Sequence, residues 1–183
     1  MQIDRLSLRG FRNYEDAQAQ FVPGVNLLVG GNANGKTNLL EAVSYLSTGR
    51  SFRTRREAEL IRFGADFAEL RAQVQSQERT RELRAVLFSG RRPRQLWLAG
   101  VKQRSRAALS GVLTSVLFCP EDLMLVRAGA AARRRFLDTA LCQLRPNYAR
   151  YLEEYNRLHE HKTRILRDSE EKPSLLSMWE DFS

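Results

Sequence analysis

Short stretches in which apolar and polar residues alternate recur along the first half of the chain, a pattern typical of β-strands with one buried face. Turn dipeptides such as Ser89-Gly90 and Ala99-Gly100 separate the later stretches, which favours an antiparallel meander. The strands predicted in this way cover residues 2–9, 17–21, 67–74, 81–88 and 95–98.

Two further stretches are dominated by apolar residues without a clear alternation, at positions 25–29 and 115–118. Continuous apolar runs are typical of strands that are buried on both faces, as inside a parallel sheet. We therefore expect both stretches to form short buried strands, the first of which leads directly into a glycine-rich loop.

Helical spacing of apolar residues follows that loop and returns in the last third of the chain. Leu39, Leu40, Val43 and Leu46 fit a helix of about three turns, and Gly49 is a stop signal. Further helices are predicted at residues 57–63, 121–126, 131–144, 146 to beyond 166, and 175–182.

The chain is strongly basic, with a formal net charge of +9 and a pI near 10.2. Of its 30 basic residues all but Lys36, Lys102, Lys162 and Lys172 are arginine. Arginine suits phosphate contacts, which favours a polyanionic partner such as nucleic acid. Codon bias in a GC-rich genome explains the same composition, so charge alone leaves nucleic-acid binding open.

Other features indicate an ordinary cytoplasmic protein. Hydrophobic residues make up 43% and charged residues 28% of the sequence, which is typical of a globular domain. The first residues do not resemble a signal peptide, and no apolar run is long enough to span a bilayer. Cys119 and Cys142 lie in apolar segments without metal-ligand spacing, so we expect two reduced buried thiols.

The segment GGNANGKTN at residues 30–38 carries the chemistry. It fits the phosphate-loop pattern G-x-x-x-x-G-K-[ST], with a predicted strand before it and a predicted helix after it. In such loops the backbone N–H groups surround nucleotide phosphates, the lysine reaches the terminal phosphates, and the hydroxyl binds Mg²⁺. The predicted nucleotide-binding residues are Gly30, Gly31, Asn32, Ala33, Asn34, Gly35, Lys36, Thr37 and Asn38, and Thr37 is the predicted metal ligand.

The centre of this loop carries fewer glycines than usual. If Ala33 adopts a positive φ, alanine costs about 1 kcal/mol relative to glycine. Asn32 and Asn34 tolerate left-handed conformations better than most residues. Because several charge-assisted phosphate contacts outweigh this cost, nucleotide binding remains the better interpretation.

Four longer segments resemble bacterial RecF, a DNA-repair ATPase family related to the SMC and ABC-type nucleotide-binding heads. They are RLSLRGFRNY, GVNLLVGGNANGKTNLLEAVSYLSTGRSFRT, SVLFCPEDLMLV and RRRFLD. The resemblance covers nearly the whole chain. It implies an α/β phosphate-loop NTPase head with a mixed sheet, an antiparallel subdomain and the start of a helical lobe. The nucleotide-binding lobe would span residues 1–118, and the helical lobe would begin in residues 119–183.

The same resemblance assigns roles to residues outside the loop. Arg12 and Asn13 would lie beside the nucleotide, whereas Arg50, Ser51 and Arg53 would lie near the nucleotide or DNA. RecF-like proteins bind double-stranded DNA near single-strand gaps, work with RecR and RecO, and form a homodimer with ATP between the two heads. The implied function is ATP-dependent DNA binding in recombinational repair and replication restart, with ATP and Mg²⁺ as cofactors.

RecF-like proteins continue into an ABC-type signature and an acidic Walker B strand, and neither motif is present in these 183 residues. Leu109-Ser110-Gly111 begins like a signature, but Val112 and the following leucine break it. The resemblance therefore implies an amino-terminal fragment. Hydrolysis requires the missing groups, so we expect nucleotide binding without turnover, whereas the full-length protein would be a weak DNA-stimulated ATPase.

The predicted DNA contacts are arginines in two segments. One is the basic loop at residues 49–56, and the other is a hairpin tip close to Trp97, for which a solvated turn is an equally good interpretation. The residues are Arg50, Arg53, Arg55, Arg56, Arg91, Arg92 and Arg94.

Two alternatives belong to other functional classes. A loop that has decayed at Ala33 would leave a nucleotide-independent DNA-binding or scaffold module. A small-molecule phosphotransferase would need an acceptor pocket and a lid, for which no segment is evident.

His159 and His161 point to different faces of a predicted helix, so a metal pair is not expected. We predict no catalytic nucleophile.

Overall fold

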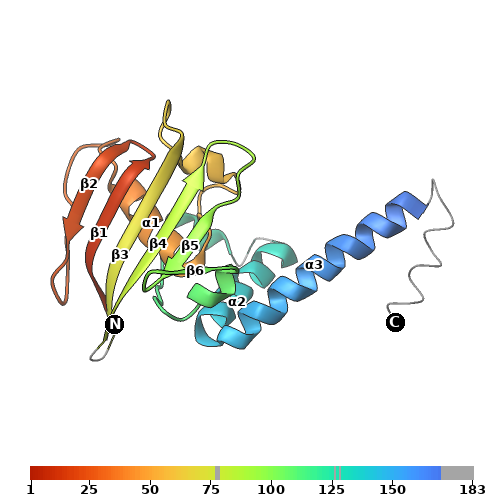
Figure 1. Ribbon diagram of the computed structural model, residues 1–183. Coiled ribbons are helices and arrows are strands. Elements are labelled where there is room, and N and C mark those ends of the chain that lie inside the picture. Colours follow the sequence, from red (N-terminus) through yellow and green to blue (C-terminus); the bar gives the residue numbers. More distant parts are fainter. Residues whose placement is uncertain (77–78, 126, 128, 170–183) are drawn as a thin grey trace.

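The computed structural model describes residues 1–76, 79–125, 127 and 129–169. Six strands of this part form one sheet in the order β2-β1-β3-β4-β5-β6, and all neighbouring pairs are antiparallel (Figure 1). The strands are β1 (Gln2–Phe11), β2 (Tyr14–Gln20), β3 (Phe67–Ser76), β4 (Arg79–Phe88), β5 (Gln95–Leu98) and β6 (Val101–Gln103). The alternating pattern predicted five of these strands and the meander, and these predictions are confirmed.

One face of the sheet forms the core because its side chains alternate. Leu6, Leu8, Leu70 and Leu83 point inward and are fully buried, while their polar neighbours point to the opposite face. The helix α1 (Lys36–Thr48) covers the apolar face and contacts β3 and β4 (Figure 1). Each buried leucine contributes about 1.5–3 kcal/mol relative to an exposed one.

The helix α1 ends where the sequence predicts it. Gly49 adopts a left-handed conformation with φ of 68°, and its N–H donates to the Tyr45 carbonyl oxygen at 2.7 Å. Its buried face, however, differs from the expected leucine stripe. Leu40 is exposed, whereas Tyr45 and Leu46 are buried together with the charged residue Glu41.

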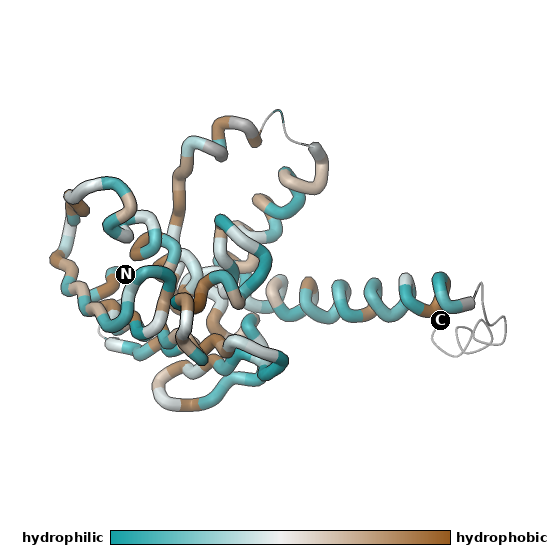
Figure 2. The backbone as a smooth tube through the Cα atoms, turned by 90° about the horizontal axis from the view of Figure 1, so that it is seen from above, coloured by the Kyte–Doolittle hydropathy of each residue, from teal (hydrophilic) through white to brown (hydrophobic). Residues whose placement is uncertain are grey.

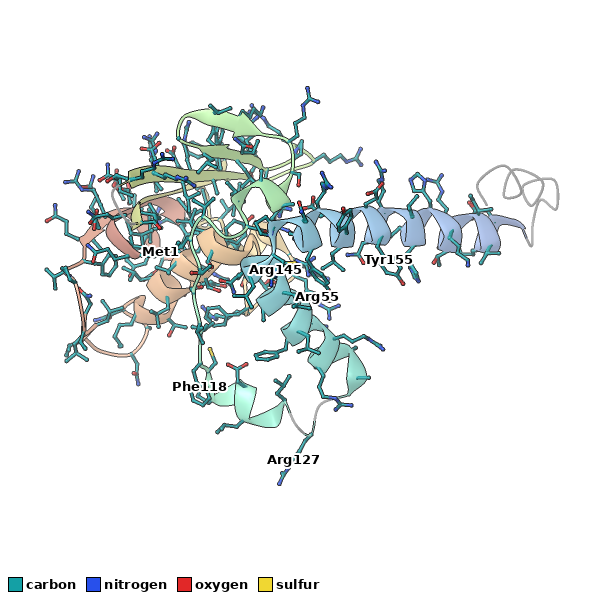
Figure 3. All side chains as sticks on the ribbon, turned by 90° about the horizontal axis from the view of Figure 1, so that it is seen from below. Met1, Arg55, Phe118, Arg127, Arg145 and Tyr155 are labelled. Atoms are coloured by element: carbon teal, nitrogen blue, oxygen red, sulfur yellow. The ribbon has the colours of Figure 1, made fainter. Side chains whose placement is uncertain are left out.

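The predicted buried strands at residues 25–29 and 115–118 are both wrong. Residues 25–30 and 114–119 are extended but pair with no strand of the described part of the chain. Val25, Leu27 and Val29 are 92%, 82% and 83% exposed, and Val116 and Phe118 are 99% and 74% exposed. A strand of a parallel sheet is buried only when neighbouring strands and helices cover it, and the described residues supply none here. Figure 3 shows Phe118 and Arg127 on a segment that extends away from the sheet and α1.

Helices form the last third of the described chain. They are α2 (Ala130–Leu144) and α3 (Pro146–Ser169), preceded by the short 3₁₀ helices η1 (Glu57–Leu60), η2 (Arg106–Leu109) and η3 (Pro120–Met124). The predictions at 131–144 and from Pro146 onward are confirmed. Those at 57–63 and 121–126 are shorter 3₁₀ turns, and the helix predicted at 175–182 lies outside the described residues.

The far end of α3 projects beyond the rest of the molecule (Figure 2). No helix within the described ranges is long and apolar enough to cross a membrane. His159 and His161 are exposed on α3. Cys119 and Cys142 are only partly buried, so the expectation that both thiols are buried is wrong.

Polar contacts connect the helical part to α1. The Ser47 hydroxyl lies 2.9 Å from the Leu113 carbonyl oxygen and 3.0 Å from Gln143 Oε1, and its single proton is shared between these two acceptors. Gln143 Oε1 also accepts the Ser115 N–H at 2.7 Å. The carboxyl end of α1 is therefore tied to α2. The proposed boundary between the two lobes at residues 118 and 119 stays a prediction.

Candidate nucleotide-binding site

The loop at residues 30–35 leads directly into α1, as the sequence predicts. Gly35 is the N-cap of α1, with a left-handed φ of 92° and no side-chain capping hydrogen bond. The first turn of α1 contains no acidic residue. The first N–H groups of the helix and the positive end of its dipole therefore have no anionic partner among the described side chains.

Glycine is required at position 35 because the β1–β2 hairpin packs against it. A Cβ atom there would lie 2.8 Å from both Asn13 Nδ2 and Tyr14 Oη. Tyr14 donates its hydroxyl to the Gly35 carbonyl oxygen at 3.1 Å. Burial raises the pKa of Tyr14, so this hydroxyl remains a donor at neutral pH. Asn13 therefore lies beside the loop, and its expected position beside a bound nucleotide stays a prediction.

Lys36 lies across the loop. Its Nζ donates to the carbonyl oxygens of Gly30 at 2.7 Å and Gly31 at 2.6 Å. Thr37 follows on the first turn of α1 and is exposed. Both side chains therefore stand at the end of the helix where a phosphate loop needs them.

Ala33 adopts the left-handed conformation that the sequence analysis considered, with φ of 66°. Its flanking residues Asn32 and Asn34 have negative φ, so they do not carry the bend in its place. An alanine in this conformation costs about 1 kcal/mol. The loop is therefore mildly strained at its centre, at an exposed residue.

Arg12 reaches the same helix from the β1–β2 turn, where its φ is 54°. Its guanidinium binds the Glu41 carboxylate through two hydrogen bonds, from Nε at 2.9 Å and from Nη2 at 2.8 Å. Its Nη1 donates to the Glu59 carbonyl oxygen at 2.7 Å. Such bidentate pairs fix the guanidinium in orientation as well as in position.

Glu41 is the residue that sequence reasoning missed. Its side chain is completely buried on α1, and it also accepts hydrogen bonds from Ser51 and Arg53. Burial alone raises the pKa of Glu41, but the hydrogen bonds and charges of these partners outweigh it, so the pKa is lowered. Its position on the same helix face as Ala42 and Tyr45, in a chain rich in arginine, could have predicted a buried carboxylate paired with arginine.

The predicted DNA-contacting arginines separate into different places. Arg53 returns to the amino-terminal half of α1, where its Nη1 donates to Asn38 Oδ1 at 2.7 Å. Arg50 follows the carboxyl end of α1, which lies about 15 Å from Asn38 by the helix rise. Arg55 and Arg56 are exposed between these positions and η1.

The prediction that the arginines of the hairpin tip are exposed is wrong for one of them. Arg91 and Arg92 are exposed, and Arg92 stacks on the Phe88 ring with its Cζ 4.1 Å from the ring centroid. Arg94, which we expected to be exposed with them, turns inward and forms an ion pair with Glu57 next to the Tyr45 hydroxyl. The buried Tyr45 phenol and the partly exposed Glu57 carboxylate offer a better site than solvent for a guanidinium that is itself partly exposed.

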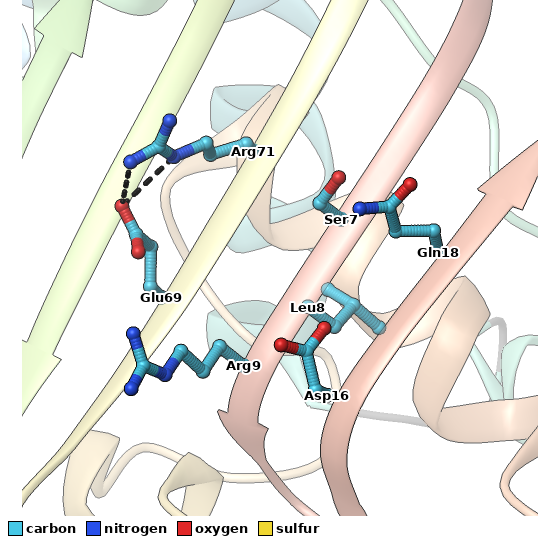
Figure 4. A pocket seen from close by; sticks show the side chains of 7 residues that line it. All are labelled: Ser7, Leu8, Arg9, Asp16, Gln18, Glu69 and Arg71. Carbon is cyan, nitrogen blue, oxygen red and sulfur yellow. Dashed lines mark hydrogen bonds and ion pairs between the residues drawn. The ribbon is translucent and has the colours of Figure 1, made fainter.

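The outer face of the sheet carries a separate shallow pocket of about 190 Å³ between β1, β2 and β3 (Figure 4). Polar side chains line it, including Arg9, Asp16 and Glu69. Arg71 and Arg84 both pair with Glu69, which leaves little free charge. This pocket shares no residue with the phosphate loop, and it resembles the solvated face of an antiparallel sheet.

Comparisons with known proteins identify the family and the fold. The family model described as RecF/RecN/SMC N terminal domain matches residues 2–93. A "DNA replication and repair protein RecF" from Symbiobacterium thermophilum is 39% identical over 182 residues, which cover 99% of this chain and 48% of the relative. The protein of that name from Acetivibrio thermocellus is 33% identical over 180 residues, covering 98% and 48%.

Two solved structures of a recombination mediator protein RecF in the RecFOR pathway have the same fold. RecF-ATPrS superposes with a TM-score of 0.85 and 30% identity over 93% of this chain and 46% of that one. RecF-ATP gives a TM-score of 0.83 and 29% identity over 92% and 47%. The chain thus spans about half the length of the curated relatives and structures that it matches. The predicted ABC/SMC-type head is confirmed as the fold class.

Proposed function

Since the chain belongs to the family of the RecF/RecN/SMC N terminal domain and is similar to RecF along nearly all its length, we propose that residues 30–38 bind ATP. In this proposal ATP controls the binding of double-stranded DNA in recombinational repair. The observation that carries it is the uncapped start of α1 below a loop whose lysine contacts only loop carbonyls.

The loop offers the groups that a triphosphate needs. The free N–H groups and the positive end of α1 attract phosphate oxygens. The Lys36 ammonium exchanges the Gly30 and Gly31 carbonyls for the more strongly charged terminal phosphates. The similarity to RecF structures that carry ATP and ATPrS supports ATP as the nucleotide.

Mg²⁺ fits this site with one side-chain ligand. The Thr37 hydroxyl is exposed on the first turn of α1, and the described residues contain no group of three or more acidic, histidine or cysteine side chains suited to a metal. Magnesium commonly takes few protein ligands and completes its shell with phosphate oxygens and water. When bound, the ion would neutralise charge on the terminal phosphates.

The proposal that the protein binds DNA rests on its positive charge. The chain has a formal net charge of +9, and Arg50, Arg55, Arg56, Arg91 and Arg92 are exposed. These side chains would contact phosphates of duplex DNA without reading its sequence. We further propose that ATP joins two copies of the head, that RecR and RecO are partners at gapped or stalled replication sites, and that the protein works in the cytoplasm.

Isothermal titration of ATP with Mg²⁺ into the protein and its Lys36→Ala variant tests the nucleotide site. Loss of a charge-assisted contact should weaken binding about tenfold or more. Lys102→Ala, which removes an exposed lysine of β6, is the control and should bind ATP normally. A titration without any Lys36-dependent binding heat would support the nucleotide-independent scaffold instead.

DNA binding is tested by its dependence on salt and nucleotide. The affinity for a gapped duplex should fall steeply between low and moderate salt, because each phosphate contact releases a counterion. ATP should raise this affinity in the protein but not in Lys36→Ala. An affinity that barely changes with salt would rule out the phosphate-contact mechanism.

A further inference from the structure

A larger pocket, of about 640 Å³, lies at the end of the sheet where β1 begins and where β3 and β4 meet (Figure 1). Its walls include Met1, Val74, Arg79, Arg81 and Val112, and we call it the β3–β4 pocket. It shares no residue with the phosphate loop, with α1 or with the arginines assigned to DNA. Binding of ATP and DNA therefore leaves this pocket without a role.

Two arginines of the pocket occupy inward-facing positions of the sheet. Side chains two residues apart on a strand point to the same face, so Arg79 and Arg81 continue the row of the fully buried Leu83. Their cross-strand partners on β3 are Ser76 and Val74. Val74 is still buried, whereas both arginines are exposed. The apolar row of the sheet thus ends in two cations.

The charges of these arginines are available to a ligand. No described residue forms an ion pair with Arg79 or Arg81, and no acidic side chain of the described chain lines the pocket. On the outer face, by contrast, Arg71 and Arg84 share the carboxylate of Glu69. Alternate positions of a strand are about 7 Å apart, so two guanidiniums can each bind a separate carboxylate.

The rest of the pocket is apolar. Met1 is 57% exposed, and its Sδ accepts the N–H of Thr114 at 3.2 Å, which holds this side chain beside the segment that follows η2. Val74 and Val112 are 1% and 9% exposed and belong to the core. An apolar group that enters the pocket would therefore pack mainly on Met1, with the core beneath it.

We propose that the β3–β4 pocket binds an acidic peptide segment of a partner protein. Carboxylates of this segment pair with Arg79 and Arg81, and an apolar side chain between them packs against Met1. The site adds a protein-binding surface to the proposed function and does not depend on the phosphate loop.

An acidic peptide fits this pocket better than duplex DNA does. The phosphates of a duplex lie on its convex outer surface, and its backbone offers no apolar group to fill a hollow beside Met1. A peptide supplies both parts, because its carboxylates bind arginine in a bidentate manner and its apolar side chain suits a concave site. The net charge of +9 also attracts an acidic segment.

The first test uses a fluorescent pentapeptide in which a leucine stands between two pairs of acidic residues. Measured by fluorescence anisotropy, Arg81→Ala should weaken its binding about tenfold. The matched control is Arg5→Ala, because Arg5 is also an exposed strand arginine but precedes the buried Leu6 and so points to the opposite face. This control should bind within about twofold of the unchanged protein. Equal affinities of the two variants would overturn the proposal.

Two control peptides separate a specific site from simple charge attraction. Amides in place of the four carboxylates should weaken binding about tenfold or more. Glycine in place of the leucine should weaken it about fivefold, because the contact with Met1 is lost. If the glycine peptide bound as tightly as the leucine peptide, charge alone would explain the binding and the proposal would be wrong.

Cross-linking locates the bound peptide directly. With a photoreactive diazirine analogue in place of the leucine, mass spectrometry should find the peptide attached to Met1 or Val112. Attachment mainly to α3 or to the outer face of the sheet would contradict the proposal.

Two other occupants are outcomes of the same experiments. If Arg79→Ala and Arg81→Ala lower the affinity for duplex DNA and leave peptide binding unchanged, the site belongs to DNA. The chain also spans about half the length of its relatives. If the peptide binds this chain but not a form extended to the length of those relatives, the continuation of the chain fills the pocket. Either result would overturn the proposal.

The phosphate loop can be tested independently of this site. Lys36→Ala should bind the acidic peptide with unchanged affinity, because Lys36 does not line the pocket. Failure of ATP binding would then leave the β3–β4 pocket intact, and failure of peptide binding would leave the proposed function standing. A peptide affinity that fell with Lys36→Ala would contradict the separation of the two sites.

Discussion

The antiparallel sheet with α1 and the extended segments at residues 25–30 and 114–119 are both rich in apolar residues, yet only the first buries them. Leu8 and Leu70 are inaccessible to solvent between the sheet and α1, whereas Leu27, Val29 and Val116 are exposed. The difference therefore does not follow from the hydrophobicity of the residues. It follows from the presence of neighbouring strands.

Each strand of the sheet pairs with at least one strand that is close in sequence, such as β3 with β4 or β4 with β5. These pairings satisfy backbone N–H and C=O groups and place alternate side chains against α1. The segments at 25–30 and 114–119 pair with no strand of the described chain. An apolar run becomes a buried strand only when a partner supplies both hydrogen bonds and a covering surface.

The largest expected effect tests this comparison with one substitution in each region. Leu70→Ala should lower the free energy of unfolding by about 2–5 kcal/mol, because it removes buried methyl groups and leaves a cavity. Leu27→Ala, the same change at an exposed site, should alter it by less than about 0.5 kcal/mol. Urea titrations of both variants provide the measurement. A similar loss in the two would mean that residues 25–29 are buried in solution.

The next effect concerns two glutamates that are both paired with arginine. Glu41→Gln should lower the free energy of unfolding by about 2 kcal/mol, because it weakens a buried bidentate pair that holds Arg12. Glu15→Gln, in an exposed pair with Arg62, should cost less than about 1 kcal/mol. Chemical denaturation at pH 7 measures both.

The effect of Glu41 should depend on pH in a defined direction. Its pKa is lower in the folded protein than in the unfolded chain, where it is about 4.3. The carboxylate therefore contributes its full stability above about pH 5, and this contribution is lost as the pH falls through the folded value. The stability difference between the protein and Glu41→Gln should shrink below about pH 4. A constant difference down to pH 3 would contradict this assignment.

A smaller effect distinguishes two glycines with nearly the same φ, Gly35 with 92° and Gly24 with 91°. Alanine at either position should cost about 1–2 kcal/mol through backbone strain. A Cβ at Gly24 meets no atom within 4 Å, whereas a Cβ at Gly35 collides with Asn13 and Tyr14. Only Gly35→Ala should therefore also weaken ATP binding, as titration calorimetry would show. Equal ATP affinities would mean that the hairpin does not shape the site.

The sequence was sufficient where structure depends on local pattern. Alternation located the sheet strands, and Gly49 located the end of α1, because these features require only near neighbours. The continuous runs at 25–29 and 115–118 were misassigned because burial of such runs depends on strands far away in the chain.

The residues of the candidate site fall into the same two groups, those that a local pattern or a resemblance predicts and those that depend on distant segments. The phosphate-loop motif predicted residues 30–38, and the resemblance to RecF predicted Arg12 and Asn13; nucleotide binding by all of them stays a prediction. Glu41 was missed because its burial depends on cations from two other segments, and no local pattern encodes that meeting. Arg94 was misplaced for a similar reason, since its partner Glu57 lies 37 positions earlier in the chain.

The smallest expected effect addresses the strained centre of the loop. Ala33 and Ala99 both have positive φ, of 66° and 48°, but Ala99 lies in the β5–β6 turn, away from the phosphate loop. Glycine at either position relieves about 1 kcal/mol of strain and loses a similar amount through the greater freedom of the unfolded chain. Thermal unfolding should therefore change little in both variants, and ATP affinity should remain within about twofold. A tenfold tighter binding by Ala33→Gly alone would show that the strain at Ala33, rather than the contacts of Lys36, limits nucleotide binding.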